Sequence, residues 1–154
     1  MAAVPEELAY NEAVRAITHQ AGLLDGLRSR AGILLGATSL VTSFFGTAAL
    51  ADGDVSVWAA LAVASFLGTA LLVVAVLWPR KDWRFVFSAS TIIDVLERSE
   101  RPVELADAYR ELAVRLDANH RANEAKLGRM LWAFQAGCAL LTVEVLMWIL
   151  ALAR

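Results

Sequence analysis

The sequence predicts an all-α integral membrane protein with three transmembrane helices and a cytosolic helical bundle. Two observations carry this prediction. First, 58% of the 154 residues are hydrophobic, which is high for a soluble domain. Second, residues 31–51 and 55–78 contain no charged residue, and 130–153 contains only Glu144. Runs of this length span the roughly 30 Å hydrocarbon core of a bilayer when they are helical, and lipid requires them to be helical.

Residues 5–28 have the pattern of an amphipathic cytosolic helix. Pro5 suits the first turn of a helix. Gly22 and Gly26 weaken the last turns, so we expect a bend before the membrane. The predicted apolar stripe recurs at spacings of four and three and consists of Tyr10, Val14, Ile17, Ala21 and Leu24.

Small residues at fourfold spacing mark the three apolar runs. Such patterns let helices approach closely and are typical of helix-packing faces in membranes. Whether the partner helix belongs to the same chain or to a neighbouring copy stays open. The glycines predicted to lie in these faces are Gly32, Gly36, Gly46, Gly68 and Gly137.

Tryptophans stand near the ends of the second and third runs. Trp58 and Trp78 are placed to anchor the second span at the two membrane interfaces, and Trp132 and Trp148 are placed to do the same for the third. The Trp78-Pro79 pair indicates where the second span ends.

Residues 79–129 form the predicted cytosolic helical segment. A short amphipathic helix is expected over 85–97 and a proline-containing break at 99–102. Beyond it, one continuous helix is predicted from about 103 to 152, ending in the third span, 130–153. Its cytosolic stripe should pack on the 5–28 and 85–97 helices within a single domain, 1–154. The predicted seam consists of Leu105, Tyr109, Leu112, Leu116, Asn119 and Asn123.

The seam becomes polar at Asn119 and Asn123, and this pattern has two interpretations. Buried asparagines in helical seams set register and oligomeric state. Alternatively, these side chains are solvated near the lipid headgroups.

Glu144 is the one charged residue inside the predicted spans. A charge at membrane depth costs about 2.5–3.5 kcal/mol on insertion scales, so the side chain should face protein or water. One interpretation makes it a pore-lining or proton-responsive group in an oligomer. The other makes it a helix–helix hydrogen-bonding group, with a partner among Ser39, Thr42, Ser43, Ser65 and Thr69.

The distribution of positive charge predicts the orientation. Of the 14 basic residues, three precede the first span, ten lie between the second and third spans, and Arg154 follows the third. The positive-inside rule therefore places the N-terminus and 79–129 in the cytoplasm and the C-terminus outside.

Enzymatic and nucleic-acid functions find no support in the sequence. There is no phosphate-binding glycine loop, nucleophile elbow or pair of catalytic carboxylates. The two histidines and the single cysteine, Cys138, do not make a metal site or a disulfide. Basic residues at 80–84 and 121–129 alternate with acids beside the spans, which favours lipid headgroups over nucleic acid. We expect no cofactor, no metal and no catalytic residue.

The layout resembles a known group of membrane modules. It combines two closely spaced spans, a cytosolic helical segment of about 50 residues, and a third span continuous with a cytosolic helix. The stretches that carry the resemblance are 23–31, LLDGLRSRA, and 119–130, NHRANEAKLGRM. Over roughly 15–152 the chain resembles the prokaryotic Pycsar transmembrane effectors (PycTM) and the related SLATT group, which act in nucleotide-activated antiphage defence.

This resemblance implies a homo-oligomer in the bacterial inner membrane that permeabilises or perturbs the membrane when triggered. A nucleotide second messenger or a soluble sensor protein would be the trigger, although 154 residues leave no room for a separate nucleotide-binding domain. The alternative is a non-enzymatic scaffold or accessory subunit that docks a soluble partner on its cytosolic helices. A constitutive ion channel is a third interpretation, but it needs a polar file through the spans.

Overall fold

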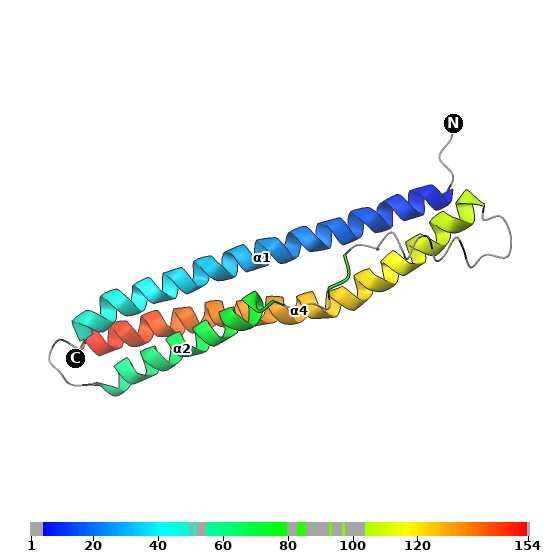
Figure 1. Ribbon diagram of the computed structural model, residues 1–154. Helices are drawn as coiled ribbons and strands as arrows, with labels where there is room; N and C mark the ends of the chain where they lie inside the picture. Colours follow the sequence, from blue (N-terminus) through cyan, green and yellow to red (C-terminus); the bar gives the residue numbers. More distant parts are fainter. Residues whose placement is uncertain are drawn as a thin grey trace. The chain divides into compact units, whose positions relative to one another are not determined.

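The computed structural model describes residues 5–49, 51, 55–79, 83–85, 93, 97 and 104–153 (Figure 1). In this part of the chain there are three helices: α1 (Pro5–Ala49), α2 (Val57–Leu77) and α4 (Leu105–Leu152). No strand occurs among the described residues, so the all-α class is confirmed there. The helix expected over 85–97 lies largely outside the described residues.

Helix α1 is continuous over 45 residues, so the predicted 5–28 helix and the first span are one element. The bend expected at Gly22 and Gly26 does not interrupt the helix. Each glycine weakens a helix by about 1 kcal/mol relative to alanine, but Leu24 and Leu27 are buried beside them and stabilise these turns. The buried face recurs at alternating spacings of three and four and consists of Ile17, Gln20, Leu24, Leu27, Ala31, Leu34 and Thr38.

The predicted 5–28 stripe is therefore partly wrong. Ile17 and Leu24 are buried as expected, but Val14 is 38% exposed and Gln20 occupies the position given to Ala21. The buried residues of α1 alternate at spacings of three and four, which is a seven-residue period. Position 14 does not belong to this period and therefore lies outside the buried face of α1.

Helix α2 falls within the predicted 55–78 run. The Ser56 hydroxyl accepts a hydrogen bond from the Ala59 backbone N–H at 3.1 Å and caps the N-terminus. The helix ends at Leu77, where the Trp78 N–H donates to the Val74 carbonyl at 2.8 Å. Pro79 follows and cannot continue the ladder of hydrogen bonds.

Helix α4 begins within two residues of its predicted start and runs continuously for 48 residues to Leu152. Five buried residues of this helix stand seven apart, as in a coiled-coil seam. They are Leu116, Asn123, Met130, Gly137 and Glu144.

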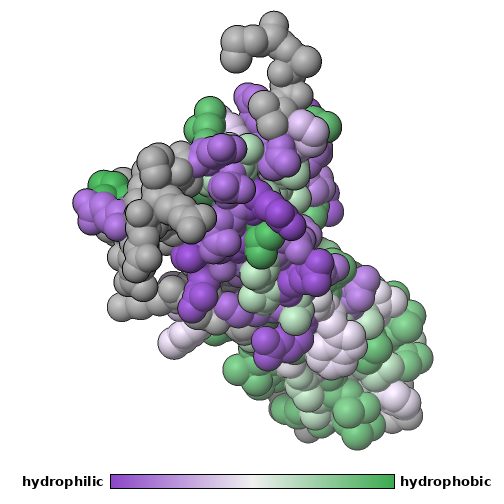
Figure 2. Space-filling view, turned by 90° about the vertical axis from the view of Figure 1, so that its right-hand side faces the viewer, coloured by the Kyte–Doolittle hydropathy of each residue, from purple (hydrophilic) through white to green (hydrophobic). Residues whose placement is uncertain are grey.

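All three helices are long and apolar enough to cross a membrane. The exposed surface agrees, because large hydrophobic and hydrophilic side chains gather in separate regions of the visible face (Figure 2). The exposed large hydrophobic residues of the spans include Ile33, Leu40, Phe44, Leu61, Leu67, Leu71, Leu146 and Ile149. In water this surface would be unfavourable, whereas acyl chains cover it without cost.

Contacts divide the chain into two compact units. The polar unit contains Met1–Leu24 and Arg80–Leu127, and the apolar unit contains Asp25–Pro79 and Gly128–Arg154. Two of the three boundaries between the units fall inside helices, one in α1 and one in α4, and the third follows Pro79 after the end of α2.

Within each unit the described parts of α1 and α4 run parallel. In the polar unit the rings of Tyr10 and Tyr109 lie 5.4 Å apart, and further along Gln20 contacts His120. In the apolar unit Thr42 contacts Glu144, and α2 packs antiparallel to α4.

Candidate functional site

A polar layer around Glu144 lies inside the apolar unit. Glu144 and Thr38 are both fully buried. The Thr42 hydroxyl donates to Glu144 Oε1 at 2.6 Å, and the Thr38 hydroxyl donates to Oε2. Both threonines stand on α1, one helical turn apart, so a single carboxyl engages two turns of the neighbouring helix. Polar groups matched in this way hold two helices in one register.

This arrangement agrees with the helix–helix interpretation of Glu144 and does not make it pore-lining within one chain. Of the five partners considered from sequence, Thr42 is the one whose hydroxyl bonds to Glu144 in the described structure. Thr38 was not anticipated.

Several other hydroxyls in the spans bond to their own helices. Ser39 is exposed and donates to the Leu35 carbonyl at 2.7 Å, and Ser43 is exposed on the same side of α1. On α2, Ser65 donates to the Leu61 carbonyl. Thr69 donates to the Ser65 carbonyl at 3.0 Å and approaches the Gly137 carbonyl of α4 at 3.5 Å. Such back-bonding lets a hydroxyl sit in lipid or in a dry core without an unpaired donor.

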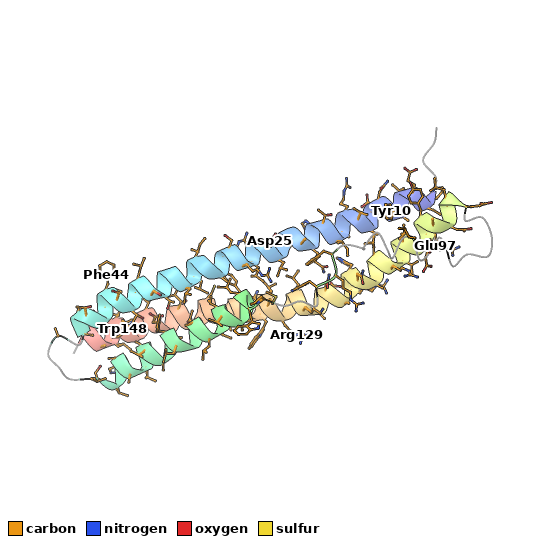
Figure 3. All side chains as sticks on the ribbon, viewed as in Figure 1. Tyr10, Asp25, Phe44, Glu97, Arg129 and Trp148 are labelled. Atoms are coloured by element: carbon orange, nitrogen blue, oxygen red, sulfur yellow. The ribbon has the colours of Figure 1, made fainter. Side chains whose placement is uncertain are left out.

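Trp148 lies one turn beyond Glu144 and is fully buried, so its prediction as an interfacial anchor is wrong. It packs in the core with Ala59 and Ala62 of α2. A Cβ at Gly46 would lie 3.4 Å from the Trp148 ring, so the small residues around it provide the space for the indole. Figure 3 labels Trp148 on α4, near the C-terminal end of the chain. Trp78 and Trp132 are 64% and 68% exposed, as interfacial anchors are.

The five predicted glycines separate into two groups. A Cβ at Gly68 would come within 2.9 Å of Leu140 Cδ1, and one at Gly137 would come within 3.1 Å of Leu34 Cδ2. Together with Gly46, these glycines serve packing within the chain. Gly32 and Gly36 differ, because a Cβ at either position would meet no atom within 4 Å.

The predicted seam of α4 is present in the polar unit except at its first residue. Leu112, Leu116 and Asn123 are buried, and Tyr109 and Asn119 are half-buried. Leu105 is 69% exposed and does not belong to the seam. The pairing of Tyr10 with Tyr109 explains why: Leu105 is one turn earlier, level with the charged first turn of α1.

Two buried side chains, Gln20 and Asn123, bond to backbone carbonyls in the polar unit. Gln20 Nε2 donates to the His120 carbonyl at 3.2 Å, and Asn123 Nδ2 donates to the Arg84 carbonyl at 3.1 Å. Buried Asn123 favours the register-setting interpretation over solvation near headgroups. Next to Arg84, the Trp83 ring stacks on the Phe85 ring with 5.3 Å between their centroids. Lys126 Nζ lies 5.7 Å from the centroid of the Trp83 ring.

The described residues contain no group of three or more potential metal-ligating side chains, and the Cys138 thiol is free and half-buried. A scan against protein-family models finds no match to this chain. Comparisons with curated proteins and with solved structures likewise find no similar protein.

Proposed function

We propose that the protein is a homo-oligomeric effector of the bacterial inner membrane that permeabilises or perturbs the membrane when triggered. The observation that carries this proposal is the outward face of α1. Gly32 and Gly36 are exposed there with open space above them, and Ser39 and Ser43 continue the same face one and two turns later.

Lipid contact alone gives no reason for such small residues. The exposed face of α2 carries large side chains such as Leu61, Leu67 and Leu71. Small faces on membrane helices favour close association with another helix. The intrachain helices already use Gly46, Gly68 and Gly137, so a second copy is the partner we propose for Gly32 and Gly36.

The continuity of α1 and α4 supports a triggered mechanism. Each of these helices contributes residues to both units. Binding of a nucleotide second messenger or a soluble sensor protein to the polar unit would alter packing on helices that continue into the apolar unit. The resemblance to Pycsar and SLATT modules supports the same mechanism, with the N-terminus and the polar unit in the cytoplasm.

The test is inducible expression in a bacterial host together with a nucleotide cyclase, with membrane potential followed by a voltage-sensitive dye. Triggered cells should depolarise, and the double variant Gly32→Leu/Gly36→Leu should protect them. Gly22→Leu is the matched control, because a Cβ there also meets open space but lies before the span. An intact potential under trigger, or a monomer by native mass spectrometry in detergent, would count against the proposal.

The second candidate is a scaffold that docks a soluble partner. It is favoured by Leu8 and Val114 in the polar unit, which are 60% and 61% exposed although this unit is otherwise rich in charge. A scaffold would leave the membrane potential unchanged under the same trigger. Its partner would be lost on Leu8→Ser or Val114→Ser substitution.

A further inference from the structure

Contacts inside the apolar unit set the relative heights of its three helices. A Cβ at Gly137 of α4 would lie 3.1 Å from Leu34 Cδ2 of α1, and one at Gly68 of α2 would lie 2.9 Å from Leu140 Cδ1 of α4. Position 34 is therefore about level with 137, and position 68 is about level with 140. Because α1 runs parallel to α4, α2 runs antiparallel to it, and each helix rises by about 1.5 Å per residue, these two pairs set the level of the other positions.

Two arginines and two tryptophans lie at one end of the apolar unit. Arg28 on α1 is level with position 131 of α4, and Trp78 at the end of α2 is level with position 130. Arg129 and Trp132 stand within two residues of these positions on α4. Trp78, Arg129 and Trp132 are exposed, and Figure 3 labels Arg129 on α4. The four residues, from three helices, therefore lie within one helical turn in height.

Arg28 has a hydrogen-bond donor without an acceptor. The residue is half-buried, and its Nε is buried with no hydrogen-bond partner in the described part of the chain. Asp25, one turn earlier on α1, is exposed and does not accept from this nitrogen. An arginine guanidinium stays charged in proteins, and a buried donor on a charged group costs free energy when it is left unpaired. An anion is the acceptor that would remove this cost.

The end of the unit that carries Arg28 is positive and lies where the apolar runs meet water. Residues 25–30 and 128–132 contain three arginines and one aspartate, a net charge of +2, and the apolar runs begin at 31 and 130. The sequence at the other end contains Asp52, Asp54 and Arg154, a net charge of −1. The anions concentrated at a membrane–water boundary are lipid phosphates, and exposed tryptophans are typical of the same depth.

We propose that Arg28 and Arg129 bind the phosphate group of an anionic phospholipid at this end of the apolar unit. The Nε–H of Arg28 and one of its terminal N–H groups donate to two phosphate oxygens, as a planar guanidinium can. Arg129 adds positive charge from a second helix, and Trp78 and Trp132 lie at the depth of the lipid glycerol. An anionic headgroup is preferred over a zwitterionic one, because the same arginines repel the ammonium of the latter.

This site is independent of the proposed effector function, since it needs neither a second copy nor a trigger. A lipid held by both arginines would link α1 to α4 at the membrane boundary through one phosphate. Failure of the lipid test would leave the depolarisation test of the effector function unaffected.

Native mass spectrometry of the full-length protein in detergent, titrated with phosphatidylglycerol or phosphatidylcholine, tests the proposal. Phosphatidylglycerol should bind more tightly than phosphatidylcholine. Arg28→Gln should weaken phosphatidylglycerol binding by about tenfold, the loss expected for a hydrogen bond to a charged group. Arg110→Gln is the matched control, because it removes the same charge from an exposed position of α4 in the polar unit, and it should leave the binding unchanged.

Arg129→Gln provides a second variant in case Arg28→Gln does not fold, and it should weaken the binding as well. Inorganic phosphate and glycerol 3-phosphate distinguish a lipid from a soluble phosphate, and neither should displace the lipid at equal concentration. The proposal is overturned if a soluble phosphate competes as well as the lipid, or if phosphatidylcholine binds as tightly as phosphatidylglycerol. It is also overturned if Arg110→Gln weakens the binding as much as Arg28→Gln or Arg129→Gln does.

Discussion

At the scale of single residues, the hydrogen bonds of Glu144 decide whether it stabilises or destabilises the spans. A buried carboxyl without partners is a liability, whereas two threonine donors convert it into a link between α1 and α4. Valine has the shape of threonine but no hydroxyl, so replacing Thr38 or Thr42 by valine removes a hydrogen bond to Glu144 without changing the packing.

We therefore expect Thr42→Val and Thr38→Val each to destabilise the protein by about 0.5–2 kcal/mol, as loss of a buried hydrogen bond does in water or membranes. Equilibrium unfolding in mixed detergent measures the change. Ser39→Ala is the control, because the Ser39 hydroxyl is exposed and bonds only to its own helix in the described structure. Equal losses for the threonine and serine variants would show that the Glu144 bonds contribute nothing.

The sequence could identify Glu144 but not all of its surroundings. Its importance follows from being the sole charge in the apolar runs, and Thr42 was among the partners considered. Thr38 and the burial of Trp148 depend on the α1–α4 register and on the space left at Gly46. A tryptophan near the end of an apolar run is equally consistent with an interfacial anchor, so no local signal separates the two placements.

At the scale of elements, the sequence predicts the bounds of α2 and α4 closely. The length of a charge-free run sets the extent of α2, and the absence of proline explains the continuity of α4. Helix α1 was expected in two pieces, since glycine weakens helices. Its continuity is explained by a seven-residue repeat from Ile17 through Leu24 and Ala31 to Thr38, which keeps one face packed throughout. Applied to the N-terminal stripe, that period also explains why Gln20 is buried and Val14 is not.

Close packing between α2 and α4 makes Gly68 sensitive to size. A Cβ at this position would lie 2.9 Å from Leu140 Cδ1, so Gly68→Val should destabilise the protein by about 1–3 kcal/mol through overpacking. Leu140→Ala should restore part of the loss, because it removes the atoms in the way. A double-mutant cycle in the same unfolding assay gives the coupling.

Gly36→Val is the matched control for size alone. It adds the same atoms to a membrane helix where nothing lies within 4 Å, so the stability of a single chain should change little. If Gly68→Val is as harmless as Gly36→Val, or if Leu140→Ala adds its full cost to that of Gly68→Val, the contact between the two helices is not as close as described.

At the scale of the whole molecule, the strongest pattern is the separation of chemistry between the two units. The polar unit carries most of the charge, and the apolar unit exposes large hydrophobic side chains from all three helices. Composition along the chain predicted this division, because the charges cluster between the apolar runs. The register within each unit was not predictable, since it depends on which helix faces meet.

The separation also predicts how the chain crosses the membrane. Ten of the 14 basic residues lie between 79 and 129, and loops rich in Lys and Arg remain on the cytoplasmic side. In a Cys138→Ser background, a membrane-impermeant maleimide should label Ala51→Cys in intact spheroplasts. It should label Ala122→Cys only after lysis, and both positions are exposed in the structure. The Cys138→Ser parent should remain unlabelled throughout. The reverse pattern would place the polar unit outside the cell, where a cytosolic trigger could not reach it, and would exclude the proposed mechanism.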